Sequence, residues 1–338
     1  MKRLPAALAA LLLLLLSGCG GTEGADMSSF APAEEERLVI YTSHPASVYD
    51  PLVKEFEERT GIWIQVETGG TAALLERLEA ERDDPQCDLL FGGGADSLTA
   101  RKDLFAHYAT PLAADIAPEL LCGDGSWTPF SSLPVVMIYN PVLVRMNPPD
   151  GWESLLNRVW RGRIAFADPK TSGFSYTALS TLTQVLPQED VLETFYANLD
   201  GRTLSGLGEV LEAVSDAVAD GSCAIGVTTE AAALEAVGAG RDVVMLYPKE
   251  GTSVVADGLA VIKGCAHEEN ARQFIDFALG ADVQQYVARE CLRRPVRTEL
   301  LQPAEETEGL ILMEYDLARA AAERGAVLAR WRELEETS

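Results

Sequence analysis

The stretch RLVIYTSHPASVYDPLVKEFEERTGIWIQVE, residues 37–67, decides the fold class because its hydrophobic period changes twice. RLVIYT at 37–42 and GIWIQVE at 61–67 are apolar runs of strand length. Between them, Leu52, Val53 and Phe56 recur at helical spacing. A strand, a helix and a second strand in this order favour a parallel sheet with helices on its faces. The stretch therefore predicts an α/β fold.

The same alternation continues along the rest of the chain. A helical pattern at 71–83 leads into a strand-like run, CDLLFG, at 87–92. Further strand-like runs occur at 132–140, 163–168, 223–228, 242–248 and 258–264. An amphipathic helix is expected at 269–280, and a long charged helix at about 309–336. The length of 338 residues suggests about two domains.

The N-terminal stretch MKRLPAALAALLLLLLSGC, residues 1–19, has the composition of a secretory signal. Lys2 and Arg3 precede an apolar run that is too short to span a membrane, which needs about 20 residues. The small residues before Cys19 resemble a bacterial lipobox, in which that cysteine carries the lipid. We expect a signal peptide at 1–18 and a lipidated tether at 19–36. The protein would then be exported to the periplasm or the outer face of the cell membrane, anchored through Cys19.

Net charge, cysteine spacing and the absence of catalytic motifs argue against several classes of function. The net charge of −25 argues against a nucleic-acid partner, although local amides and arginines still allow a small anionic ligand. No CxxC motif or Cys/His cluster suggests a structural zinc site, and we expect no cofactor. The absence of G-x-S-x-G, HExxH and Walker A patterns favours a binding protein over a secreted enzyme. Five cysteines remain besides Cys19, and their odd number leaves at least one thiol free: Cys87, Cys122, Cys223, Cys265 and Cys291.

Small, hydroxyl-bearing or glycine residues follow five of the expected strands. Helix capping explains any one of these loops by itself, because Ser, Thr and Gly are favoured at helix N-termini. Together they predict a cleft lined with helix N-termini, whose free amides and dipoles suit an anion or a polar solute. The loops are Ser43-His44, Thr68-Gly69-Gly70-Thr71, Gly92-Gly93-Gly94, Thr171-Ser172-Gly173 and Thr228-Thr229-Glu230.

Several segments in order resemble one group of proteins: VIYTSHP, EFEERTGIWIQVETGG, CDLLFGGG, GWESLLNRVWRGRIAFADPKTSG, AIGVTTE and ENARQFIDFALG. The group is the solute-binding proteins of ABC importers, in the cluster that contains ferric-iron-binding proteins. Its other members bind thiamine, sugar phosphates, phosphoglycerate or 2-aminoethylphosphonate. The resemblance implies a two-lobed periplasmic-binding-protein fold of type II, with the ligand between the lobes. It also implies permease subunits as partners, and we expect a monomer.

By the same resemblance, residues 37–128 and 256–296 form lobe one. Residues 129–255 and 297–338 form lobe two. Ferric members commonly carry a Glu after the third strand and a Tyr-Tyr pair after the strand that matches AIGV. Here Gly92-Gly93-Gly94 and Thr228-Thr229-Glu230 stand at those places. Tyr41 and Glu230 remain as possible donors to ferric iron, which prefers anionic oxygen ligands. Ferric iron is therefore the alternative, and no metal ligand is assigned.

In ferric members, the loop that matches Thr171-Ser172-Gly173 contacts the anion that accompanies the metal. We therefore expect this loop to hold a phosphate, a phosphonate or a similar oxyanion through hydroxyls and the amides of Gly173 and Phe174. Thr228 and Thr229 would face it, and Gly70 and Thr71 would grip it from the opposite lobe. The full expected ligand set is Ser43, His44, Gly70, Thr71, Gly93, Thr171, Ser172, Gly173, Thr228, Thr229, Glu230 and Arg294.

Three members of this set have a second interpretation. His44 is placed for a ligand, but it also fits a loop histidine without an ionic role. Glu230 suits a ligand ammonium or the first turn of a helix. Among Arg293, Arg294 and Arg297, Arg294 is the expected oxyanion clamp, and surface ion pairing is its alternative. The predicted function is binding of a small phosphonate or organophosphate by hinge closure, for an ABC importer. The alternatives are a ferric receptor, a secreted enzyme and a sensory binding protein.

Overall fold

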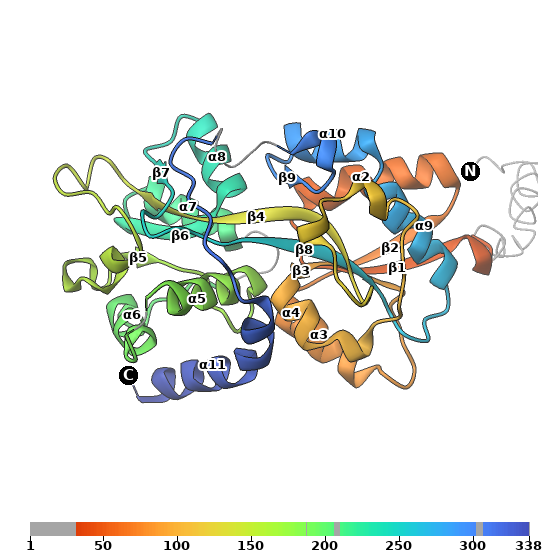
Figure 1. Cartoon of the computed structure of the whole chain (residues 1–338), viewed down its shortest axis with the longest axis horizontal. Coiled ribbons are helices and arrows are strands. Elements are labelled where there is room, and N and C mark those ends of the chain that lie inside the picture. Colours follow the sequence, from red (N-terminus) through yellow and green to blue (C-terminus); the bar gives the residue numbers. More distant parts are fainter. Residues whose placement is uncertain (1–31, 187, 206–209, 302–306, 338) are drawn as a thin grey trace, which may run out of the picture.

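A computed structural model describes residues 32–186, 188–205, 210–301 and 307–337. The predicted signal peptide, Cys19 and most of the predicted tether lie outside these residues. Within the described part of the chain, no helix has the length and apolar character needed to cross a membrane. Two lobes lie side by side along the long axis of the molecule, and strands β4 and β8 run between them (Figure 1).

Within the described residues, nine strands form one mixed sheet that runs through both lobes. Seven of them follow the order β2-β1-β3-β8-β4-β6-β5, and the other two, β7 and β9, pair with β4. In the first lobe, β1 (Arg37–Thr42) lies parallel to both β2 (Trp63–Thr68) and β3 (Leu89–Gly94). β3 then pairs antiparallel with β8 (Val254–Val261), which pairs antiparallel with β4 (Thr128–Tyr139). Because β4 and β8 belong to both halves of the sheet, they are the connection about which the lobes can hinge.

The second lobe continues the sheet from β4. β6 (Ile225–Thr229) pairs antiparallel with β4 and parallel with β5 (Ile164–Ala165). The short strands β7 (Val244–Leu246) and β9 (Arg294–Pro295) also pair with β4. The parallel pairing expected from residues 37–92 is confirmed for β1, β2 and β3, whereas the strands at the centre of the molecule, β3, β8, β4 and β6, pair antiparallel. Strand direction there is set by chain segments that cross between lobes, and the alternation of helices and strands does not reveal these crossings.

Each lobe has its own hydrophobic core, and among the described residues each core is accompanied by a further buried cluster in the same lobe. Phe56, Phe91 and Phe274 are fully buried in the first core, and Trp152, Phe195 and Trp331 in the second. The first lobe carries helices α2 (Ala46–Thr60), α3 (Thr71–Ala80), α4 (Ala95–Ala100), α9 (Glu268–Ala278) and α10 (Ala281–Arg289). The second carries α5 (Gly173–Val185), α6 (Val191–Leu199), α7 (Val210–Ala219) and α8 (Glu230–Gly238). Short 3-10 turns lie at Glu34–Glu36, Lys102–Leu104, Ala113–Asp115, Pro118–Leu120, Trp152–Leu156, Arg158–Trp160 and Thr298–Leu300.

The C-terminal helix α11 (Leu317–Thr337) bridges the lobes. It buries Trp331 in the second core and lies beside α4 of the first lobe (Figure 1). It begins eight residues later than the sequence suggested. The run at 163–168 likewise forms a strand only at Ile164–Ala165. The five cysteines of the described part of the chain are free thiols.

Candidate functional site

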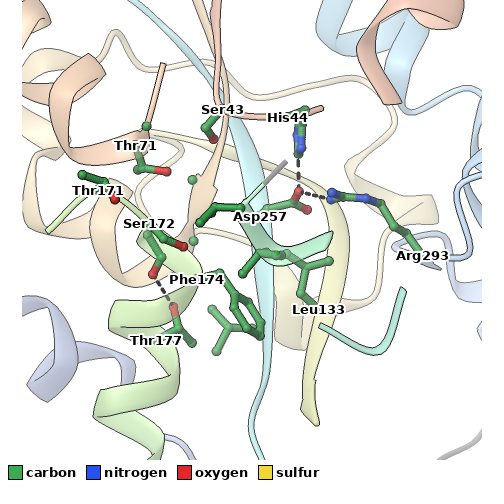
Figure 2. A pocket seen from close by; sticks show the side chains of 17 residues that line it. Ser43, His44, Thr71, Leu133, Thr171, Ser172, Phe174, Thr177, Asp257 and Arg293 are labelled. Atoms are coloured by element: carbon green, nitrogen blue, oxygen red, sulfur yellow. Dashed lines mark hydrogen bonds and ion pairs between the residues drawn. The ribbon is translucent and has the colours of Figure 1, made fainter. Parts of the chain in front are cut away.

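A cavity of about 70 Å³, lined by both polar and apolar side chains, lies between the lobes, where β1 and β3 end and where α3 and α5 begin (Figure 2). A single water needs ~10–15 Å³ of such space, so the cavity has room for a small polar headgroup. Eight residues of the expected ligand set line it: Ser43, His44, Gly70, Thr71, Gly93, Thr171, Ser172 and Gly173. The helix that follows Pro169 therefore points its first turn into this cavity.

Helix α5 begins at this cavity because its preceding loop is fixed by short-range hydrogen bonds. The carbonyl of Asp168 accepts from the backbone N–H groups of Thr171 and Ser172, at 3.1 and 2.9 Å. Ser172 is the N-cap, and its Oγ accepts from the backbone N–H of Ser175 at 3.2 Å. The remaining N–H groups of a helix's first turn have no partner within the helix. They give this end of α5 the partial positive charge that attracts an anion.

The N-termini of α3 and α5 meet across the cavity. A Cβ atom added to Gly70, the N-cap of α3, would lie 2.5 Å from the backbone oxygen of Thr171. A Cβ atom added to Gly173 would lie 2.9 Å from Oγ1 of Thr71. These contacts join residues of opposite lobes, so the structure is in a closed arrangement. Glycine is required at both positions because backbone or short side-chain atoms of the other lobe occupy the Cβ site.

The crossing strand β8 contributes a buried ion pair to the cavity wall. Asp257 is 2% exposed and accepts a 2.8 Å hydrogen bond from Nη1 of Arg293. Its other oxygen accepts from the backbone N–H and the hydroxyl of Ser131 on β4, at 3.0 and 2.5 Å. Burial raises the pKa of Asp257 above its ordinary value, although Arg293 and Ser131 act in the opposite direction. Both charged side chains line the cavity.

Sequence reasoning missed Asp257. Its signal was available, because Asp257 is the single charged residue in the otherwise apolar strand VVADGLAV. Burying an unpaired charge in a strand costs free energy, so a charged residue in a buried strand indicates that an oppositely charged or hydrogen-bonding partner lies beside it. Arg293 is that partner. It is one of the three arginines, with Arg294 and Arg297, that the sequence offers as candidates for an oxyanion clamp.

His44 lies beside this ion pair. It is 4% exposed, and its ring contacts those of Phe91 and Phe130, with centroids 4.5 and 5.6 Å apart. Burial, with a smaller contribution from the positive charge of Arg293, lowers the pKa of His44 well below its ordinary value, so the ring is neutral. Its Nε2 lies 3.4 Å from Oδ2 of Asp257 but makes no hydrogen bond to any described residue.

The other four expected ligand residues do not line the cavity. Thr228 is fully buried and donates its hydroxyl to the carbonyl of Leu211, a residue of the cavity lining. Thr229 caps α8 by accepting from the backbone N–H of Ala232 at 3.1 Å. Glu230 and Arg294 form a bidentate ion pair, in which Nε and Nη2 of Arg294 donate to the two carboxylate oxygens of Glu230 at 2.7 and 2.8 Å.

The described residues contain no group of three or more His, Cys, Asp and Glu side chains placed to hold a metal ion. Of the possible iron donors, Tyr41 is fully buried and donates its hydroxyl to Glu81, away from the cavity lining. Glu230 accepts from Arg294 and from the hydroxyl of Tyr247. Burial and the hydrogen bond to Glu230 raise the pKa of Tyr247 to about 12, which disfavours the phenolate that ferric iron prefers.

A second polar contact joins the lobes next to the cavity. Asp96, at the start of α4, is fully buried and accepts a 2.7 Å hydrogen bond from the hydroxyl of Thr177 on α5. It also accepts from the hydroxyl of Tyr315 at 2.9 Å and from the backbone N–H of Ser97. Burial raises the pKa of Asp96 above its ordinary value. Because Thr177 also lines the cavity, this contact links the closed arrangement to the site.

Two α/β lobes that share crossing strands and close over a cavity with helix N-termini in its wall define a hinged solute-binding protein. The chain belongs to the bacterial extracellular solute-binding protein family, whose model matches residues 84–320. The predictions of a two-lobed type II binding-protein fold and of a binding protein rather than an enzyme are thereby confirmed. Membership also places the protein outside the cytoplasm.

Relatives of this chain carry names that refer to different ligands. Iron uptake protein A1 of Synechocystis is 25% identical over 295 residues, covering 83% of this chain and 81% of the relative. The putative 2-aminoethylphosphonate-binding periplasmic protein of Salmonella typhi is 21% identical over 311 residues, covering 86% and 88%. The solved structure of AfuA from Actinobacillus pleuropneumoniae, with fructose-6-phosphate bound, has a TM-score of 0.81 at 23% identity and covers 89% and 99%. These similarities support the fold and the family and leave the ligand open.

Proposed function

We propose that the protein is the solute-binding component of an ABC importer and that its solute is a small phosphonate or organophosphate. The observation that carries the proposal is the meeting of two helix N-termini, those of α3 and α5, at one cavity that also holds the guanidinium of Arg293. Both helix ends favour negative charge, and a guanidinium pairs well with oxyanions. The relatives named for 2-aminoethylphosphonate and solved with fructose-6-phosphate add support.

Binding would be coupled to closure because the contacts come from both lobes. Gly70 and Thr71 belong to the first lobe, and Thr171, Ser172 and Gly173 to the second. A ligand that touches both groups interacts only partly with an open protein and fully with a closed one. Such a difference in affinity shifts the population toward the closed state. The closed protein would then dock on permease subunits, which are the partners expected of an importer.

Calorimetric titration of the purified protein tests the proposal. We expect 2-aminoethylphosphonate or a sugar phosphate to bind, and ferric citrate to give no heat at the same protein concentration. Binding of ferric citrate alone would overturn the proposal and favour the iron-transport alternative. A protein that binds none of these oxyanions would overturn it as well.

Two helix-cap variants locate the site. Ser172→Ala and Thr229→Ala each remove a side-chain oxygen that caps a helix, so each should lower the free energy of unfolding by about 1 kcal/mol. Only Ser172 lines the cavity. We therefore expect Ser172→Ala to weaken binding roughly 10- to 150-fold, as for a lost hydrogen bond to a charged group, and Thr229→Ala to leave affinity unchanged. Equal affinities of the two variants would contradict the assignment.

A further inference from the structure

The charges that face the cavity cancel. Among the described lining residues, Asp257 and Arg293 carry opposite charges and His44 is neutral. The remaining lining groups are hydroxyls, backbone amides and apolar side chains. The net attraction for an anion therefore comes from the two helix N-termini, each equivalent to roughly half a positive charge. Together the two helix N-termini supply roughly one positive charge, which matches a ligand with one net negative charge better than a ligand with two.

Asp257 keeps one acceptor position that the protein does not use. An ionised carboxylate accepts at about four lone-pair positions. The backbone N–H and hydroxyl of Ser131 occupy two of these on one oxygen, and Arg293 occupies one on the other. In Figure 2 the carboxylate lies between His44 and Arg293, beside the cavity. Because Asp257 lines the cavity, a ligand group can approach the remaining position on Oδ2 from the cavity.

The neighbouring Nε2 of His44 is buried and also lacks a hydrogen-bond partner among the described residues. It lies 3.4 Å from Oδ2 of Asp257, yet the two atoms do not form a hydrogen bond with each other. Buried polar atoms are nearly always satisfied, so an unsatisfied one at a cavity points to a ligand group. A carboxylate can only accept, so a ligand group that reaches Oδ2 must donate a hydrogen.

We propose that Asp257 determines specificity, and that it selects a ligand whose oxyanion is accompanied by a hydrogen-bond donor, either an ammonium or a hydroxyl close to the anionic group. This inference rests on the proposed function and narrows its ligand class. A donor next to the oxyanion satisfies Oδ2 of Asp257. A donor-free dianion instead places an anionic group near a buried carboxylate without compensation, and the closed site rejects it.

A series of three phosphonates of similar size tests the inference. The probes are 2-aminoethylphosphonate, 2-hydroxyethylphosphonate and ethylphosphonate, titrated above the second ionisation of the phosphonate so that all three headgroups carry the same charge. We expect one or both donor-bearing probes to bind roughly 10- to 150-fold more tightly than ethylphosphonate, as for a hydrogen bond to a charged group. Asp257→Asn should shrink this preference at least about tenfold, because the acceptor loses its charge.

The series separates the two proposals. If ethylphosphonate binds as tightly as both donor-bearing probes, the role of Asp257 is refuted while the oxyanion site stands. If no probe and no sugar phosphate binds, the proposed function itself fails. The affinities of the three phosphonates for the unmodified protein test the donor requirement even if Asp257→Asn does not fold. A folded Asp257→Asn variant that keeps the full preference would overturn the assignment to this carboxylate.

Discussion

Gly70→Ala should block closure of the lobes while leaving each lobe folded. The backbone of Gly70 has φ −68° and ψ 145°, which alanine adopts without strain. The new Cβ atom would lie 2.5 Å from the backbone oxygen of Thr171, whereas ordinary contact begins at 3.4 Å. The two groups must therefore separate by about 0.9 Å, the difference between these distances. Because hydrogen bonds to Asp168 hold Thr171 in its loop, the movement falls on the interface between the lobes.

Inserting one methyl group into a packed contact costs about 1–3 kcal/mol. Here only the closed state carries this cost, so the affinity for an oxyanion that binds by closure should fall roughly 5- to 150-fold. Calorimetry with the tightest phosphonate measures the affinity. Small-angle X-ray scattering at a ligand concentration just sufficient to saturate the unmodified protein measures closure, and Gly70→Ala should keep a larger radius of gyration at that concentration.

A matched control separates the contact from general effects of a Gly-to-Ala change. Gly123 has no atom within 4 Å of its Cβ position, so Gly123→Ala should bind and close normally. Alanine is also a poorer N-cap than glycine, so Gly70→Ala should lose some stability, about 1 kcal/mol or less. Unchanged affinity and an unchanged radius of gyration for Gly70→Ala would refute the conclusion that the tips of α3 and α5 meet in the bound state.

Two further substitutions test the contacts around the site. Thr177→Val removes the hydroxyl that donates to buried Asp96, so it should destabilise the closed state by about 1–3 kcal/mol. Thr183→Val on the same helix is the control and should leave ligand affinity unchanged. Calorimetric affinities of the two variants check this prediction. His44 has a pKa below 6.5 in the folded protein, so the unfolded chain takes up this proton first as pH falls. Stability from His44 should be complete above pH 6.5 and should fall by up to about 1.4 kcal/mol per pH unit below it. Denaturant unfolding of His44→Asn should lack this slope, and an identical slope in both proteins would contradict the reasoning.

The local pattern of the sequence determined where most elements lie and which loops carry the site. RLVIYT became β1 as expected, and the polar loops after three expected strands and before α5 reached the cavity. These features depend on hydrophobic period and on capping chemistry, which act over a few neighbouring residues. The family resemblance added the two-lobed architecture, which periodicity alone did not contain.

Tertiary structure decided which of two adjacent arginines lines the cavity between the lobes. Successive residues of an extended chain point to opposite sides, so only one of Arg293 and Arg294 can face the cavity. Pairing of β9 with β4 sets this choice: Arg294 lies opposite Ser132 and reaches Glu230, and Arg293 reaches Asp257. No local pattern distinguishes the two residues.

The crossing of β8 between the lobes was likewise decided by tertiary structure. It carries Asp257 into the cavity from a run that reads as an ordinary buried strand. The contact of Gly70 with Thr171 likewise joins positions from different lobes that no local pattern relates. The sequence by itself specified helix tips suited to an anion. Which of these tips meet, and which buried charge lies beside them, depended on strand register and lobe closure, because both bring together residues that are distant along the chain.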